Sequence, residues 1–190
     1  MAKQFSRIEP PLREFIERQH IFFTASATAD SRVNLSPKGS DSFRVIGPNL
    51  VAYLDQTGSG NEAAAHLRAD GRLTIMFCAF EGAPMILRLY GHGRSLPRGS
   101  EDYAKLLATT FAGDEPPGAR QIVVLDVELV QTSCGYSVPL YDYKAERPTL
   151  INWALRKGED GIREYWRERN AVSIDGLPTG MLEVLGEPAD

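Results

Sequence analysis

The residues best placed to do chemistry lie in one glycine-interrupted polar loop, DQTGSGNE, which begins at Asp55. An apolar strand is expected to end there, and alanine-rich sequence typical of a helix begins near Ser59. Glycines let a backbone approach a ligand closely, and the free N–H groups of a first helical turn favour a phosphate. The loop therefore predicts an anion site, with Thr57, Ser59 and Asn61 as uncharged donors. An ordinary helix start, with Ser59 as N-cap and Glu62 completing a capping box, explains the same spacing equally well.

A second polar segment, NLSPKG, runs from Asn34 to Gly39. It would place the hydroxyl of Ser36 and the ammonium of Lys38 beside an anionic or electron-rich ligand. Taken alone, this segment is more typical of a turn with an exposed lysine. Arg88 interrupts an apolar strand and either points outward, which is the more general behaviour, or pairs with an anion.

The sequence lacks the motifs of other nucleotide-binding, metal-dependent and nucleophilic sites. The loop at Asp55 lacks the ending of a Walker loop and does not match a dinucleotide fingerprint. His66 is expected to be a packed or surface residue, because the three histidines have no metal-ligand spacing, and we expect no metal. No nucleophile with a neighbouring base is evident, so the catalytic residues stay unassigned. Cys78 and Cys134 lie far apart in apolar strand-like sequence and are expected to be buried, reduced thiols.

Composition narrows the function classes. The 190 residues are 43% hydrophobic, which suits one globular domain with a substantial core. A net charge of -4 without a basic run argues against a nucleic-acid partner. The polar N-terminus and the lack of an apolar run of about 20 residues argue against a signal peptide and a membrane span. We therefore expect a cytoplasmic protein.

The elements that must position these residues are mostly short strands. Alternating or β-branched sequence predicts strands at residues 21–27, 32–36, 43–46, 50–54, 72–80, 85–94 and 122–131, the first four forming a meander. Helices are expected at 10–19, 59–68, 101–111, 150–156 and 162–169, with Trp153 and Trp166 as packing anchors of the last two. Hairpin-length turns predict a mainly β fold with helices, an antiparallel, Greek-key-like barrel of six or seven strands. We expect a single domain over residues 1–190, with the barrel at about 20–135 and a helical C-terminal extension at about 148–190.

Together these segments resemble the pyridoxamine 5′-phosphate oxidase-related flavoproteins, which adopt the FMN-binding split barrel. The resemblance covers about residues 5–135. It rests on RVNLSPKG at 32–39, YLDQTGSGNE at 53–62, RLTIMFCAFEG at 72–82 and ILRLYG at 86–91, in that order. The C-terminal SIDGLP resembles an uncharacterised branch of the same group.

The resemblance implies non-covalently bound flavin mononucleotide (FMN) in a cleft between the two protomers of a homodimer. Together with the loop, it gives these cofactor-binding candidates: Asn34, Ser36, Lys38, Gly39, Tyr53, Leu54, Thr57, Ser59, Gly60, Asn61 and Arg88. The phosphate-binding Ser-Arg-Lys of the true oxidases falls at Ser59-Gly60-Asn61, so both cations are missing. The phosphate would then be held by backbone amides, or its charge would be met by Arg68, Arg88 or an arginine of the partner chain. This departure also weakens pyridoxamine phosphate as the substrate.

The implied function is that of an FMN-dependent oxidoreductase acting on an unidentified small molecule. In such a protein the chain positions and tunes the flavin, and Lys38 would stabilise the anionic reduced ring. Two alternatives stay open. One is a flavin-binding protein without turnover, serving as a store, sensor or electron carrier. The other is a split-barrel enzyme that uses deazaflavin or haem.

Overall fold

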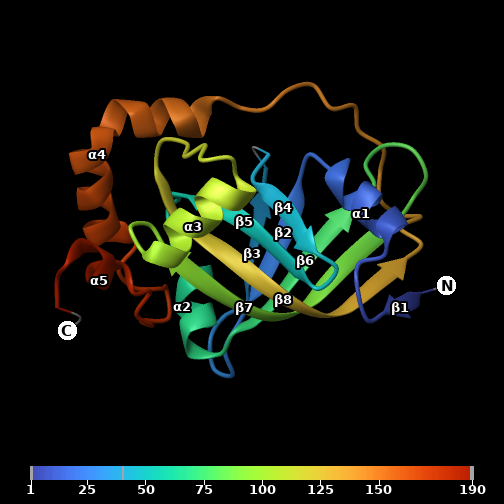
Figure 1. Cartoon of the computed structure of the whole chain (residues 1–190), viewed down its shortest axis with the longest axis horizontal. Coiled ribbons are helices and arrows are strands. Elements are labelled where there is room, and N and C mark those ends of the chain that lie inside the picture. Colours follow the sequence, from blue (N-terminus) through green and yellow to red (C-terminus); the bar gives the residue numbers. More distant parts are fainter. Residues whose placement is uncertain (1, 40, 189–190) are drawn as a thin grey trace.

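The computed structural model describes residues 2–39 and 41–188, which form one antiparallel sheet with helices around it (Figure 1). The eight strands are β1 (Lys3–Phe5), β2 (Phe22–Ser26), β3 (Asn34–Lys38), β4 (Phe43–Gly47), β5 (Leu50–Gln56), β6 (Arg72–Cys78), β7 (Ile86–Pro97) and β8 (Ala119–Ser133). Their hydrogen-bonded order is β3-β2-β6-β7-β8-β5-β4, and β1 pairs with β8. Because β3 and β4 end this path without pairing with each other, the sheet does not close.

The centre of the sheet is buried on both faces. Alternate residues of β5 point to opposite faces. Val51 and Tyr53 join one apolar cluster, whereas Ala52 and Leu54 join another. The first cluster is covered by α1 (Pro10–Glu17) and the second by α3 (Glu101–Thr110). Double coverage explains why β5 is a continuous apolar run rather than an alternating one.

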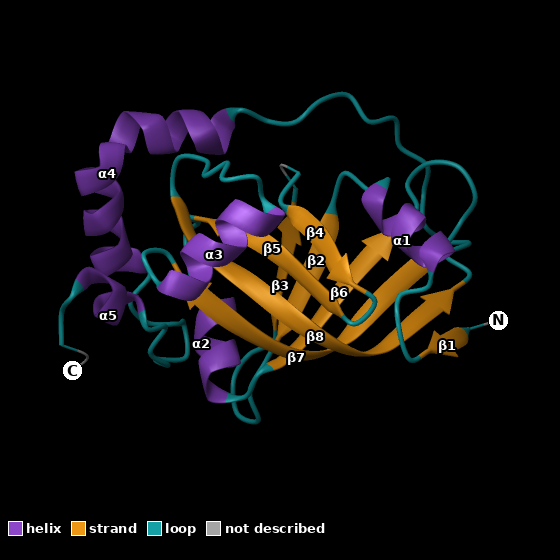
Figure 2. Cartoon of the chain, in the orientation of Figure 1, coloured by secondary structure: helices purple, strands orange, loops and turns teal. Residues whose placement is uncertain are grey.

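The remaining helices lie at one end of the sheet (Figure 2). They are α2 (Glu62–Ala69), α4 (Thr149–Arg169) and α5 (Met181–Leu185). Between β8 and α4, residues 134–148 cross the molecule as a long stretch without helix or strand. A non-helical Gly158 divides α4 into two segments. The second segment packs against α5 around the buried Trp166.

Most predicted elements are confirmed, and the antiparallel β architecture with helices is as expected. The C-terminal helices are present, with α4 bent between the two predicted segments. The four-strand meander is wrong, because β2 pairs with β3 and β4 with β5, but β3 and β4 do not pair. The described residues form eight strands rather than six or seven, since β1 was not predicted. The helix expected from residue 59 begins at Glu62.

Candidate functional site

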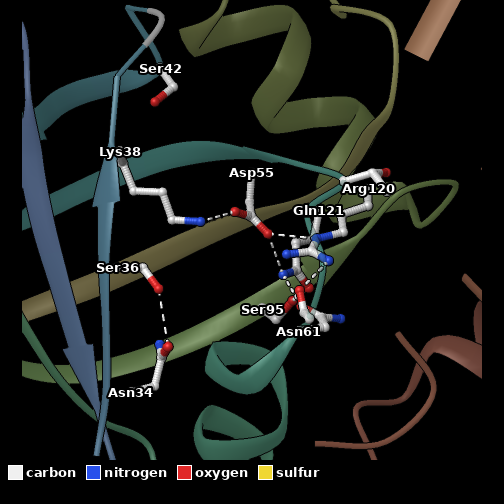
Figure 3. A network of polar contacts seen from close by, with 12 residues as sticks. Asn34, Ser36, Lys38, Ser42, Asp55, Asn61, Ser95, Arg120 and Gln121 are labelled. Atoms are coloured by element: carbon white, nitrogen blue, oxygen red, sulfur yellow. Dashed lines mark hydrogen bonds and ion pairs between the residues drawn. The ribbon is translucent and has the colours of Figure 1, made fainter. Parts of the chain in front are cut away.

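A cleft of about 730 Å³ lies beside β3, between the β5–α2 loop and the segment that ends α4. Its volume falls within the usual range of small-molecule sites, about 300–1,000 Å³. It brings together eight of the eleven predicted residues: Asn34, Ser36, Lys38, Gly39, Leu54, Thr57, Ser59 and Gly60. The two polar segments singled out in the sequence therefore line the same cleft. Figure 3 shows the side chain of Lys38 reaching from β3 to Asp55, where the loop begins.

β3 presents its polar side chains on one face. Asn34, Ser36 and Lys38 are partly buried in alternation with exposed Leu35 and Pro37, as the two-residue period of a strand requires. The Ser36 hydroxyl donates to Asn34 Oδ1 at 3.0 Å. Pro37 is tolerated here because β3 is an edge strand, hydrogen-bonded only to β2 among the described strands.

Lys38 is bound to the buried carboxylate of Asp55. Its Nζ lies 2.5 Å from Asp55 Oδ1, while Arg120 Nε and Gln121 Nε2 each donate to Oδ2 at 2.8 Å. Burial alone would raise the pKa of Asp55, but the charges of Arg120 and then Lys38 outweigh it and hold the pKa well below its ordinary value. Asp55 is therefore a carboxylate at neutral pH and fixes the position of Lys38.

Arg120, which sequence reasoning missed, is a central residue of the site. A β-bulge explains how it reaches Asp55 together with its neighbour Gln121. The β5–β8 register shifts between Asp55 and Gln56, which oppose Gln121 and Ala119, so Arg120 is the extra residue on β8. In the sequence, the one feature that marks Arg120 is its position just before a long apolar strand.

Arg120 and Asn170 hold the carbonyl groups of the polar loop. Arg120 Nη1 donates to Gly60 O and to Asn170 Oδ1, both at 2.8 Å. Asn170 Nδ2 donates in turn to Gly58 O at 3.1 Å. Within the part of the chain that the structure describes, the backbone amides from Gly58 to Asn61 make no hydrogen bond. The loop thus keeps its donors free while its acceptors are engaged.

The capping-box explanation of this loop is wrong. Because α2 begins at Glu62, its N-cap is Asn61, and Asn61 makes no side-chain cap hydrogen bond. Asn61 Oδ1 instead accepts from Gln121 Nε2 at 2.9 Å, and Glu62 Oε2 accepts the amide of Ile174 at 3.0 Å. The exposed hydroxyl of Ser59 makes no described hydrogen bond, so it is available to a ligand.

Three predicted residues do not line the cleft. Tyr53 is fully buried and packs edge-on against Phe22, and burial raises the pKa of its phenol, so it stays neutral. Asn61 is buried beneath the loop. Arg88 lies on β7 and donates to Ser133 Oγ at 3.3 Å. Thr57 does line the cleft, but its hydroxyl donates to Gly118 O and accepts from Trp166 Nε1, each at 2.8 Å.

The cations offered as partners for an anion also need revision. Arg68 forms a two-point ion pair with Glu183, and neither Arg68 nor Arg88 lines the cleft. Arg169, at the end of α4, does line it and makes no ion pair with any described residue. Formal charges along the cleft balance, with Lys38, Arg120 and Arg169 against Asp55, Glu62 and Glu168. Since Lys38 and Arg120 are already paired with Asp55, Arg169 is the cation left for a ligand.

Several other residues singled out in the sequence lie outside the cleft. Cys78 is buried as predicted, but Cys134 is exposed because it follows the last residue of β8. His66 is packed, with Nδ1 3.1 Å from Ser26 Oγ. Trp166 is a buried anchor, whereas Trp153 is only partly buried. Among the described residues there is no cluster of three or more metal-ligating side chains, and no helix is long and apolar enough to span a membrane.

Comparison with known proteins gives concordant results. The family model for pyridoxamine 5′-phosphate oxidase matches residues 8–134. The pyridoxamine 5′-phosphate oxidase family protein ustO of Aspergillus flavus is 38% identical over 192 residues, covering 92% of this chain and 76% of that protein. A HupZ variant of Group A Streptococcus superposes with a TM-score of 0.53 at 20% identity, over 66% of this chain and 99% of that one. A candidate pyridoxamine 5′-phosphate oxidase of Lactobacillus delbrueckii superposes with a TM-score of 0.51 at 18% identity, over 66% of this chain and 94% of that one. The two structural likenesses concern the fold alone, which is the split barrel expected from the sequence.

Proposed function

The chain belongs to the pyridoxamine 5′-phosphate oxidase family, and from that premise we propose that it binds FMN in the cleft beside β3 and acts as an oxidoreductase on a small molecule. One observation carries the proposal. A loop with unpaired backbone amides at Gly58–Asn61, a free serine hydroxyl and an unpaired arginine adjoins a strand that presents polar side chains to the same cleft.

The donors fit a phosphomonoester. Amides at a helix start favour an anion, and a guanidinium can meet two phosphate oxygens at once. Ser59 and Arg169 would therefore hold the phosphate together with the amides of the loop. This assignment replaces the two cations that the chain lacks at Gly60 and Asn61 with one from the end of α4.

β3 would support the ring system. FMN, when bound, supplies hydride or single-electron transfer. The chain's part is to hold the ring with Asn34, Ser36 and the ammonium group of Lys38. Because Asp55 fixes that ammonium from one side, its remaining N–H donors are available to an electron-rich edge.

We further propose that a second copy of the chain completes the site. β3 is an edge strand whose polar side chains line the cleft, and the side chains of Val33 and Leu35, which alternate with them, leave exposed apolar surface on the same strand edge. Edge strands with exposed apolar side chains favour association. A homodimer with the flavin between protomers accounts for both features.

Titration of the full-length protein with FMN and with riboflavin tests the phosphate site. We expect FMN to bind at least about tenfold more tightly than riboflavin, because riboflavin lacks the phosphate. Arg169→Gln should remove most of that preference. Arg163→Gln, on the same helix but away from the cleft, should retain it.

Equal affinity for the two flavins in the wild type would contradict the phosphate assignment. Absence of binding to either, with no gain in melting temperature, would contradict the proposed function itself. Bleaching of the bound flavin by NADH or NADPH, followed by reoxidation, would separate an enzyme from a passive flavin carrier.

A further inference from the structure

A second and larger hollow, of about 1,090 Å³, lies next to the cleft. We call it the groove. It is bounded by the end of α1, the turn after β6, the stretch at residues 134–148 and the start of α4. Pro37, Lys38, Gly39 and Leu150 line both the groove and the cleft, so the two spaces share a wall. Much of the groove comes from residues 141–156, beyond the 8–134 match to the family.

The groove has an aromatic lining. The ring of His20 stacks on that of Tyr143, with centroids 3.6 Å apart and planes at 9°. Phe80 packs against Tyr141 at 5.6 Å, and Trp153 lines the α4 side. Although they line the groove, Tyr141 and Tyr143 are exposed. Flat, partly exposed rings of this kind favour an aromatic ligand, which would remove their faces from water.

The groove is also basic, unlike the cleft. Five basic side chains line it against three acidic ones. Two of the three acids are engaged, because Glu81 accepts the amide of Tyr143 and Glu146 accepts its hydroxyl, each at 3.0 Å. Arg147 and Arg156, in contrast, make no hydrogen bond or ion pair within residues 2–39 and 41–188.

We propose that the groove binds the substrate and that this substrate is an aromatic carboxylic acid. Its ring would lie among Tyr141, Tyr143 and Trp153, and its carboxylate would pair with Arg147 or Arg156, since guanidinium groups match carboxylates geometrically. The assignment as substrate rests on the proposed function, because the shared wall at Lys38 is what brings the groove to the flavin.

A small acid fits the groove better than a second protein copy does. The groove is concave, its walls come from segments of one chain, and among the described residues its unpaired arginines, Arg147 and Arg156, outnumber its one unpaired acid, Asp142. Two identical copies that met through this face would bring the same excess of positive charge together, which opposes association.

Calorimetric titration of the FMN-saturated protein with indole-3-acetate, indole-3-acetamide and acetate separates the contributions of ring and charge. We expect indole-3-acetate to bind at least about tenfold more tightly than either the neutral amide or acetate. Arg156→Gln should weaken indole-3-acetate binding by about tenfold while leaving the amide unchanged. Tyr141→Ala should weaken the binding of both aromatic compounds, indole-3-acetate and indole-3-acetamide.

Matched variants control for general damage to the fold. Arg163→Gln lies on α4 outside the groove, and Tyr136→Ala lies in the same exposed stretch as Tyr141 but outside the groove. Neither should change the affinity for indole-3-acetate. All four variants should retain the wild-type affinity for FMN.

The outcomes are distinguishable. Failure of FMN to bind, with the acid preference intact, would remove the proposed function and leave the groove as an acid site. FMN binding without any preference for indole-3-acetate over its amide would overturn the inference. The inference would also be overturned if Tyr141→Ala changed the mass measured by sedimentation and left the affinity for indole-3-acetate unchanged. That result would identify the groove as an interface between copies of the chain.

Discussion

At the residue scale, the site depends on a buried carboxylate rather than on the loop alone. Asp55 is 2% exposed and accepts hydrogen bonds from Lys38, Arg120 and Gln121. Two cations converge on one anion, and Arg120 also holds the loop through Gly60 O. Removing the charge of Asp55 would therefore leave a buried guanidinium without its counter-ion and release Lys38.

We predict that Asp55→Asn lowers the free energy of unfolding by about 3–5 kcal/mol, the usual cost of breaking a buried pair from one side. Urea unfolding at neutral pH measures it. Asp41→Asn removes an exposed partner of Arg44 and should change stability by less than about 1 kcal/mol. Equal effects of the two substitutions would show that the Asp55 network contributes no more than a surface pair.

The same carboxylate gives a pH dependence with a definite sign. The pKa of Asp55 in the folded protein lies below that of an unfolded aspartate, about 3.9. Its contribution is therefore complete above that pH and is lost as the pH falls toward the folded-state pKa. Between about pH 5 and 3, the wild type should lose more stability than Asp55→Asn, and Asp41→Asn should follow the wild type. If the free energies of unfolding of the wild type and of Asp55→Asn fell in parallel with pH, the predicted role of Asp55 would be contradicted.

At the element scale, the sequence predicts what depends on local pattern and misses what depends on pairing. Residue alternation placed β8, and Pro10 with the apolar spacing placed α1, because both signals are local. Two features depend instead on pairing between distant strands, which a single sequence does not reveal. One is the absence of pairing between β3 and β4, and the other is the bulge that brings Arg120 to Asp55, 65 positions earlier. Both polar segments of the cleft could be identified, but Arg169 stands among alternating charges at residues 163–169, and nothing in the sequence distinguishes it as the unpaired cation.

The bend in α4 depends on Gly158, whose φ of 67° and ψ of 172° are accessible almost only to glycine. We predict that Gly158→Ala costs about 1–3 kcal/mol of unfolding free energy because alanine is strained there. Gly161→Ala, three residues on, lies in helix without a positive φ and should stabilise by about 0.5–1 kcal/mol. Urea unfolding of the two variants should therefore shift in opposite directions, and a shared direction would contradict the strain assigned to Gly158.

At the scale of the whole molecule, apolar surface remains on one edge of the sheet. β3 pairs only with β2 among the described strands, and its Leu35, which alternates with the side chains that line the cleft, is 65% exposed. One edge strand thus contributes polar side chains to the cleft and apolar side chains to the exposed surface. If a second copy covers that edge, association and flavin binding become thermodynamically linked, because each stabilises the same completed site.

We therefore predict a dimer in sedimentation velocity, and Leu35→Lys should shift it toward monomer because it places a charge on the apolar edge. The same variant should weaken FMN binding, and raising its concentration should restore part of the affinity by mass action. Leu155→Lys is the matched control, since Leu155 is similarly exposed, at 63%, but lies on α4 away from the cleft. A wild-type monomer that binds FMN with unchanged affinity at every protein concentration would refute the completed-site argument, because the linkage requires the two equilibria to move together.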